Sequence, residues 1–213
     1  MLTSPRRHAN KPDAPDASEP FYLKPGDPPS KRRILQTALR LFAHQGVETV
    51  TVRQIADEAG YTNPALFKFF ATKDDLALYL FESCYVQLFE RLRTAMDGKT
   101  SFDTRLEGIL SVFFAQLEND LDALLFVQDH LRQMWPRVSA STHRKSILSL
   151  IRQALKQGIE EGTVRDANPD LLVAAVTGTL QQFARMLHFK EFRGKASEWR
   201  QELQAIIRGV VAP

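Results

Sequence analysis

Basic side chains concentrate between Lys31 and Lys73, where their charge suits contact with a polyanion. This segment has a net charge of +4, whereas the whole 213-residue chain carries +3 and everything outside the segment sums to −1. The seven basic residues are Lys31, Arg32, Arg33, Arg40, Arg53, Lys68 and Lys73, against the acidic Glu48, Asp57 and Glu58. Such a local excess of positive charge is what neutralisation of nucleic-acid phosphates requires.

Short helices are needed to position these charges, and the segment carries their start and stop signals. Ser30 is a candidate N-cap for a first helix, which Gly46 ends because glycine adopts the left-handed C-terminal conformation without steric cost. Thr51 followed three residues later by Gln54 has the capping-box pattern. A second helix is therefore expected over about residues 52–59.

A third helix follows after a tight turn. Gly60 closes the second helix, and the three-residue connection Gly60-Tyr61-Thr62 ends at Thr62, the expected cap of the third. Leu66 and Phe70 are four residues apart and should face inward, which leaves Asn63, Ala65 and Lys68 pointing outward. The pattern predicts a helix-turn-helix, although three packed apolar helices also occur in proteins that never touch DNA.

The order of residues in this segment resembles one known family. T-V-R-Q-I-A, A-G-Y-T, A-L-F-x-F-F and T-K-D-D-L follow one another at residues 51–76, in the manner of the N-terminal domain of the tetracycline-repressor (TetR) family of bacterial transcription regulators. The resemblance extends over about 45 residues, and from about residue 75 onward it is one of helical layout alone.

The resemblance implies a role for individual side chains. Thr51 and Arg53 at the start of the second helix and Lys73 at the start of the fourth would hold the phosphate backbone, where helix N-termini favour anions. The third helix would enter the major groove of double-stranded DNA. The residues nearest the bases would be Thr62, Asn63, Pro64, Ala65 and Lys68.

Two departures from the family pattern bear on this site. Phe67 stands where the family usually has tyrosine, so it is counted with the DNA-facing residues but lacks a hydroxyl for phosphate, and Phe69 stands where histidine is frequent. Packing against the first or fourth helix is an equal alternative for both phenylalanines. Asn63-Pro64 replaces a frequent Lys-Gly pair, so the operator sequence cannot be inferred from relatives.

The chain divides into three parts. Residues 1–29 are proline-rich and expected to be a disordered tail, residues 30–75 form the helix-turn-helix domain, and residues 76–213 form a ligand-binding and dimerisation domain. An alternative for the tail is an arm in the minor groove, for which its basic residues are suited. These residues are Arg6, Arg7, His8 and Lys11.

Helical periodicity continues to the C-terminus without a strand pattern. Thr72 should cap a long helix that runs to about Met96. Further helices are expected at about 101–118, 120–134, 139–162, 169–190 and 196–211. The fold class is therefore all-α, with about nine helices.

Aromatic residues between the fourth and eighth helices provide enough apolar surface to line a pocket for a small molecule. The candidates are Phe81, Tyr85, Phe89, Phe113, Phe114, Phe126, His130 and Trp135, with Gln116, Gln128 and His143 as further polar groups. Ordinary core packing is the alternative for each of them. If a ligand binds here, it can act by moving the fourth helix.

The last two helices are apolar over more surface than a single stripe, which indicates a core or an interface. In the family that the chain resembles, this pair forms a four-helix contact between two subunits. The interface residues expected on this basis are Leu172, Val176, Leu180, Phe183, Leu187, Trp199, Leu203 and Ile206. A two-fold homodimer would place two helix-turn-helix units on a palindrome.

Catalytic and metal chemistry find little support in the sequence. Cys84 lies on an apolar helix face without a neighbouring histidine, which indicates an inert packed thiol rather than a nucleophile. Asp129-His130 with His143 lacks the spacing of a metal site. No enzyme activity, cofactor or metal is therefore expected. A single cysteine and the lack of any run of 18 apolar residues fit a cytoplasmic protein without membrane contact.

Taken together, these features predict a homodimeric repressor that a small apolar or aromatic ligand releases from a palindromic operator. Two alternatives share many of the same features. One is a helical protein that binds a small molecule or a partner through a helix-turn-helix that no longer reads DNA. The other is a DNA-binding activator.

Overall fold

All regular structure in the computed structural model is helical, and the structure describes residues 20–213. The first helices are α1 (Pro29–Gln45), α2 (Val52–Ala59), α3 (Asn63–Phe67) and α4 (Lys73–Met96). They are followed by α5 (Phe102–Asn119), α6 (Leu121–Met134), α7 (Ala140–His143), α8 (Ile147–Glu160), α9 (Pro169–His188) and α10 (Arg200–Val211). Two 3-10 turns, η1 (Trp135–Arg137) and η2 (Ala196–Trp199), complete the regular structure, and residues 20–213 contain no strand. With nine helices besides the single turn α7, the predicted all-α fold is confirmed.

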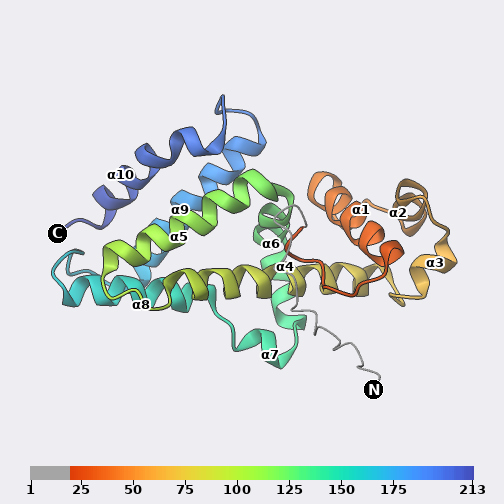
Figure 1. The fold of residues 1–213 in the computed structure, drawn as a ribbon, viewed down its shortest axis with the longest axis horizontal. Coiled ribbons are helices and arrows are strands. Elements are labelled where there is room, and N and C mark those ends of the chain that lie inside the picture. The colour runs from red at the N-terminus through yellow and green to blue at the C-terminus, as the bar shows by residue number, and fades with distance from the viewer. Residues whose placement is uncertain (1–19) are drawn as a thin grey trace, which may run out of the picture.

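The helices form an elongated molecule with α1, α2 and α3 at one end (Figure 1). Helix α4 starts at that end and continues along the body, where it packs against α5, α6 and α8. Helices α5, α8, α9 and α10 make up the opposite end (Figure 1). One continuous helix therefore connects the helix-turn-helix to the rest of the protein.

Buried side chains form two clusters. The first, called here the junction cluster, joins α1–α3 to the first half of α4 and to α6. Its fully buried members include Ile34, Leu39, Phe42, Ile55, Leu66, Leu76, Phe81, Cys84 and Phe126. The second, the body cluster, is built mainly from α5, α8, α9, α10 and the end of α4, with Leu124 and Leu125 of α6. Because the junction cluster includes α6, the core of the helix-turn-helix continues past residue 75.

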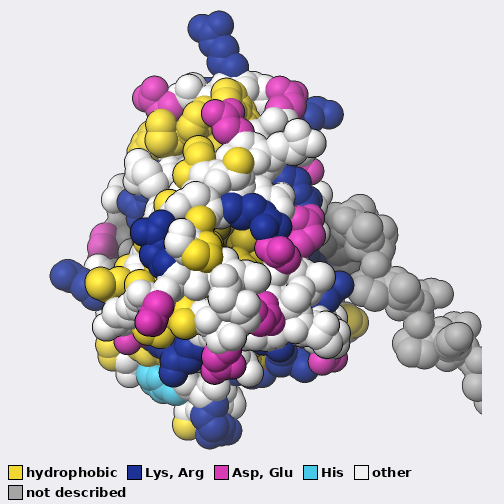
Figure 2. All heavy atoms as spheres, turned by 90° about the vertical axis from the view of Figure 1, so that its left-hand side faces the viewer, with side chains coloured by type: hydrophobic (Ala, Val, Ile, Leu, Met, Phe, Trp, Pro, Cys, Tyr) yellow, Lys and Arg dark blue, Asp and Glu magenta, His cyan; other side chains and the backbone are white. Residues whose placement is uncertain are grey.

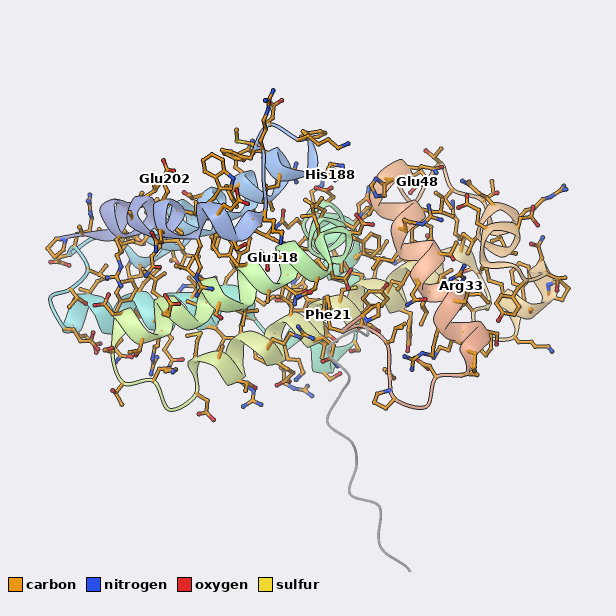
Figure 3. All side chains as sticks on the ribbon, turned by 45° about the horizontal axis from the view of Figure 1, so that its top comes forward. Phe21, Arg33, Glu48, Glu118, His188 and Glu202 are labelled. Carbon is orange, nitrogen blue, oxygen red and sulfur yellow. The ribbon has the colours of Figure 1, made fainter. Side chains whose placement is uncertain are left out.

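The segment before α1 packs on the protein, which differs from the disordered tail expected through residue 29. Tyr22 is 4% exposed and Leu23 is 9% exposed, and both belong to the junction cluster. The guanidinium of Arg91 lies 4.9 Å from the ring centre of Phe21, which sits beside α4 between the two ends of the molecule (Figure 3). Aromatic burial fixes residues 20–28, an effect that proline content alone does not reveal. The basic residues proposed as a minor-groove arm lie outside the described residues.

Helix starts agree with the predicted caps at Thr51 and Thr72, whose side-chain oxygens accept hydrogen bonds from Gln54 N at 3.1 Å and Asp75 N at 3.0 Å. The prediction of Ser30 as the first cap was wrong, because α1 begins at Pro29 after Pro28. Proline is favourable there, since the first amides of a helix have no intrahelical partner.

The helix expected at 139–162 is two helices. Residues between α7 and α8 break it, and Ser146 starts α8 by accepting a hydrogen bond from Ser149 N at 3.2 Å. Long-range contacts hold the break: Lys145 pairs with Glu90 of α4, and Ile147 N donates to the hydroxyl of Tyr85 at 3.3 Å. The last predicted helix likewise starts as η2 and becomes α10 at Arg200.

Ionisable groups meet where α1 contacts the body. His44 Nε2 lies 3.2 Å from Asp122 Oδ1 of α6, and the rings of His44 and His188 have centres 5.5 Å apart. Figure 3 shows His188 at the end of α9 that is nearest to α1. Burial, and then the charge of Asp122, raise the pKa of Asp120 to about 7. The same buried carboxylate has one oxygen without a hydrogen-bond partner among the described residues.

Candidate nucleic-acid interface and ligand cavity

The turn between α2 and α3 fixes which side chains α3 presents. Gly60 adopts the left-handed conformation with φ of 77°, and Tyr61 N donates to Ala56 O at 2.9 Å, so the chain turns sharply after α2. Leu66 is fully buried and Phe70 is 6% exposed, and together they hold α3 against the core. The opposite side of α3 faces solvent.

The expected DNA-binding residues are at the surface to different degrees. Six are exposed, namely Thr51, Arg53, Thr62, Pro64, Phe67 and Lys68, and three are partly buried, namely Asn63, Ala65 and Lys73. The hydroxyl of Thr62 makes no capping hydrogen bond to α3, although its backbone begins the helix. These positions form one surface around α3 and the start of α2.

The two phenylalanines of this segment differ. Phe67 is 49% exposed, among the most exposed large apolar side chains that the structure describes, so it does not pack inside the domain. Phe69 is partly buried against the junction cluster. The packing alternative therefore fits Phe69, and the solvent-facing position of Phe67 is compatible with a DNA contact.

Arg53 remains available to an anion. Its guanidinium lies 3.6 Å from Asp57 one turn later on α2, and both side chains are mostly exposed. Such exposed pairs contribute less than about 1 kcal/mol and exchange readily with other partners. By contrast Arg40 is held by Glu58 at 2.6 Å, which links α1 to α2.

The ammonium of Lys73 is hydrogen-bonded to backbone groups of the protein itself. Its ammonium donates to Val47 O at 2.6 Å, Val50 O at 2.7 Å and Glu48 O at 3.2 Å, in the connection between α1 and α2. An ammonium has three donors, and all three are used here. A direct phosphate contact, as expected from sequence, would require Lys73 to give up some of these bonds. In this structure Lys73 fixes the loop that leads into the cap of α2.

A cavity of about 650 Å³ lies in the body of the protein, within the range of about 300–1,000 Å³ found for small-molecule sites. Its walls come from α4, α5, α6, α8 and α9. Apolar wall residues include Leu88, Leu92, Ile109, Val112, Leu124, Val127, Leu131, Ile147, Ile151 and Leu180. Because α4 forms one wall, the cavity is directly connected to the helix that leads to the helix-turn-helix.

Three of the eight expected pocket residues line this cavity: Tyr85, Phe113 and Trp135. The hydroxyl of Tyr85 is held by Ile147 N, and burial raises its pKa. Of the further polar groups expected there, Gln128 lines the cavity, whereas Gln116 and His143 do not.

The other five expected residues are used elsewhere. Phe81 and Phe126 are fully buried in the junction cluster. The ring of His130 packs at a tilt against that of Phe126, and its Nδ1 lies 3.0 Å from the carbonyl oxygen of Phe126. Phe114 packs on Phe183, and Phe89 lies beneath the ammonium of Lys145. The expectation favoured aromatic residues, whereas most of the walls are aliphatic. Leu88 with Leu92, and Val127 with Leu131, were recognisable only as helical spacing.

Most of the expected interface residues are buried within the single chain. Leu172, Val176, Leu180, Phe183 and Leu203 are at most 6% exposed and belong to the body cluster. Leu187 and Trp199 pack partly against the same cluster, while Ile206 is 50% exposed. The apolar arc of α9 and α10 is wide enough to fill this core and still leave apolar residues outside it.

The solvent-facing side of the last two helices mixes apolar and small residues with polar ones, which include Gln182 and Arg185 on α9 and Glu202 and Arg208 on α10. Its apolar or small members are Leu171, Ala174 and Gly178 on α9, Phe189 directly after α9, and Ala205, Ile206 and Gly209 on α10. Leu171 and Phe189 are each 70% exposed. Figure 2 shows the end of the molecule opposite α3, where hydrophobic side chains gather toward the top, at the level of α10 and the segment before it.

A basic surface on a helix-turn-helix, joined by one helix to a body with an apolar cavity, defines a ligand-linked DNA-binding regulator. Residues 34–80 match the family described as "Bacterial regulatory proteins, tetR family". The HTH-type transcriptional repressor KstR2 of Mycobacterium tuberculosis is 31% identical over 150 residues, covering 68% of this chain and 75% of that protein. The chain belongs to the TetR family of transcriptional regulators, and as such it is a regulator rather than an enzyme.

Two further comparisons agree with this assignment. The solved structure of the ketosteroid transcriptional regulator KstR2 of Mycobacterium tuberculosis matches with a TM-score of 0.74 and 27% identity, over 85% of this chain and 95% of that one. The fatty acid metabolism regulator protein of Bacillus subtilis is 25% identical over 140 residues, covering 65% of this chain and 72% of that protein.

Residues 20–213 contain neither a membrane-spanning helix nor a metal-binding cluster. None of their helices has the length and apolar character needed to cross a membrane. Within the same range, no cluster of three histidine, cysteine, aspartate or glutamate residues is arranged to hold a metal ion.

Proposed function

We propose that this protein is a homodimeric repressor in the bacterial cytoplasm that a small apolar molecule releases from a palindromic operator. The observation that carries the proposal is the connection, through α4, between the exposed surface of α3 and the cavity of about 650 Å³. A ligand that fits the cavity differently in two positions of α4 would alter the spacing of two helix-turn-helix units.

On the DNA side, α3 enters the major groove. Asn63 and Lys68 carry the polar groups suited to adenine and guanine, and Ala65 provides an apolar contact for a thymine methyl. Thr62, Pro64 and Phe67 complete the surface nearest the bases. Thr51 and Arg53 at the N-terminus of α2 contact phosphates, since free amides and the helix dipole favour an anion there.

On the ligand side, the walls favour a large apolar molecule. One relative is the repressor KstR2, whose solved structure is described as a ketosteroid transcriptional regulator. Another is a regulator of fatty acid metabolism. Ketosteroids and fatty acids both have an extended hydrocarbon surface. The aliphatic walls of the cavity favour the same general class for this chain.

The dimer forms through the exposed face of α9 and α10. Leu171, Phe189 and Ile206 would be covered by the partner, and the small residues Gly178 and Gly209 allow close approach of helices. Light scattering at micromolar concentration should give twice the mass of one chain. A monomer with and without DNA would contradict this part of the proposal.

The test of DNA binding is fluorescence anisotropy with duplexes from the region upstream of the protein's own gene, beside a scrambled duplex, from low to physiological salt. Tight binding to a palindrome with a steep salt dependence supports the proposal. Equal and weak binding to every duplex, including fragments selected from the whole genome, would favour a helix-turn-helix that no longer reads DNA. Transcription that rises on occupancy would identify an activator.

A further inference from the structure

We propose that the cavity recognises an apolar carboxylic acid, with Arg132 binding the carboxylate. This inference rests on the proposed function of the cavity as the ligand site and assigns the chemical class of its ligand. It depends on the distribution of polar and charged groups around the cavity walls.

Arg132 is the single charged residue among those that line the cavity. The 20 lining residues include no aspartate or glutamate. The electrostatic character of the cavity is therefore that of one positive charge beside apolar walls. Arg132 lines the cavity and its side chain is also exposed, so it lies at the cavity rim, where an ion pair is partly screened by solvent.

Within the described residues, Arg132 also lacks an internal carboxylate partner. Several other basic residues of the body have one: Lys145 pairs with Glu90, Arg152 with Asp170, Arg185 with Asp129, and Arg200 with Glu107. Arg185 illustrates the contrast, since it lies one helical turn beyond the cavity residue Gln181 and is bound to α6 through Asp129. The guanidinium of Arg132 thus keeps its five donors available.

The polar groups of the cavity are concentrated on two neighbouring helices. Gln128 and Arg132 are four residues apart on α6, and Thr177 and Gln181 are four residues apart on α9. Residues at this spacing lie on one face of a helix, about 6 Å apart along its axis, and α6 packs against α9. The walls from α4 and α5 are almost entirely apolar. A ligand with one polar end and an apolar body matches this division.

Gln128 provides a second, independent indication of a polar ligand group. Its Oε1 is buried and has no hydrogen-bond partner within residues 20–213. A half-turn of the amide would place the donor Nε2 at the same position, where it could donate to a carboxylate. The two orientations of a glutamine amide occupy the same space and are distinguished by their hydrogen bonds. The ligand end that contacts Arg132 therefore has a hydrogen-bonding neighbour one turn away. Thr177 is less suited, since its hydroxyl already donates to Val173 O at 2.7 Å.

The charge balance favours a carboxylate over a doubly charged phosphate. One guanidinium compensates a single negative charge and can donate two parallel hydrogen bonds to a carboxylate. The N-terminus of α8 borders the cavity, but two of its first groups are already bonded, Ile147 N to Tyr85 and Ser149 N to Ser146. It therefore adds little further capacity for an anion.

The experiment uses two fluorescent probes that differ at one end, 1-pyrenebutyrate and 1-pyrenebutanol, titrated with the full chain at pH 7.5. The acid should bind about tenfold more tightly than the alcohol, as expected for one charge-assisted pair of hydrogen bonds near the surface. Arg132→Gln should remove this preference and leave the affinity for the alcohol unchanged. Arg193→Gln, at an exposed arginine that does not line the cavity, is the matched control and should behave like the parent.

One further variant separates this inference from the proposed function. Val112→Trp fills the cavity and should abolish binding of both probes. Equal binding of acid and alcohol to the parent, or an acid preference that survives Arg132→Gln, overturns the role of Arg132 while the cavity remains a ligand site. If neither probe binds the parent, or if Val112→Trp binds both as well as the parent does, the cavity is not the ligand site and both proposals fail.

Discussion

Replacing Lys73 by methionine distinguishes an internal support from a DNA contact. Methionine keeps most of the length and apolar character of the side chain and removes the ammonium. Three carbonyl oxygens in the connection between α1 and α2 then lose their donor. The change therefore acts on the loop that precedes the cap residue Thr51.

The expected loss of stability follows from the individual bonds. The bonds to Val47 O and Val50 O are short and partly buried, whereas the bond to Glu48 O is longer and exposed. A hydrogen bond to a charged group contributes about 1.5 kcal/mol at the lower end of its range, so the two partly buried bonds contribute about 3 kcal/mol, and the exposed bond is counted as zero. For a chain of this length, such a loss lowers the melting temperature by roughly 6–12 °C.

Two measurements are needed, thermal or urea unfolding and the salt dependence of operator binding. Lys73→Met should unfold more easily, while the slope of log affinity against log salt stays the same, because no phosphate contact is removed. Arg53→Met is the comparison variant, since Arg53 is exposed and is proposed to contact phosphate. It should leave stability nearly unchanged and reduce the salt slope by about one.

The opposite pattern would refute this reasoning about Lys73. If Lys73→Met keeps the parent's unfolding free energy and reduces the salt slope by about one, then its ammonium leaves the three carbonyls and binds phosphate in the complex. The role implied by the family resemblance would then be correct.

Three further changes test other parts of the structure. The pKa of Asp120 is raised to about 7, so between pH 5 and pH 7 the folded state holds a proton that the unfolded state has lost, and stability falls by about 2–3 kcal/mol over this interval. Asp120→Asn should remove this contribution, and urea unfolding at pH 5 and pH 8 that shows the same change in parent and variant would contradict it. Tyr22→Ala removes a buried ring and should cost about 3 kcal/mol, whereas an unchanged urea midpoint would mean that residues 20–28 do not support the fold. Thr72→Ala removes the side-chain cap of α4 and should cost about 1 kcal/mol in the same assay, with Thr72→Ser close to the parent; equal stability of all three would show that the cap is dispensable.

The helix-turn-helix was predictable because its signals are local. The hydrogen bond from Gln54 N to Thr51, the left-handed Gly60 and the buried pair Leu66 and Phe70 each depend on residues within a few positions. The sequence could not show that the ammonium of Lys73 is hydrogen-bonded within the protein, since the carbonyl oxygens that accept from it lie 23 to 26 residues away. Distant packing decides such contacts.

The body was less predictable for a related reason. Periodicity identifies an apolar face of α9, but it does not say whether that face meets its own chain or another. Leu172 and Val176 turned out to pack inside the protein, and Leu171 remains outside. The aromatic residues show the same limit, because Phe81 and Tyr85 are one turn apart on α4 and yet only Tyr85 reaches the cavity.

The buried thiol of Cys84 gives the protein a reporter that needs no added label. Cys84 is the sole cysteine of the chain and is fully buried in the junction cluster, where burial raises its pKa well above the usual range. The thiolate is the nucleophile that attacks a thiol reagent, so modification has to wait until this region opens and the thiol can ionise and meet the reagent. The modification rate of the native chain thus measures how often the contact between α1, α4 and α6 is broken. Because α4 also borders the cavity, that rate in the presence of a ligand or an operator shows directly whether either one tightens or loosens the junction.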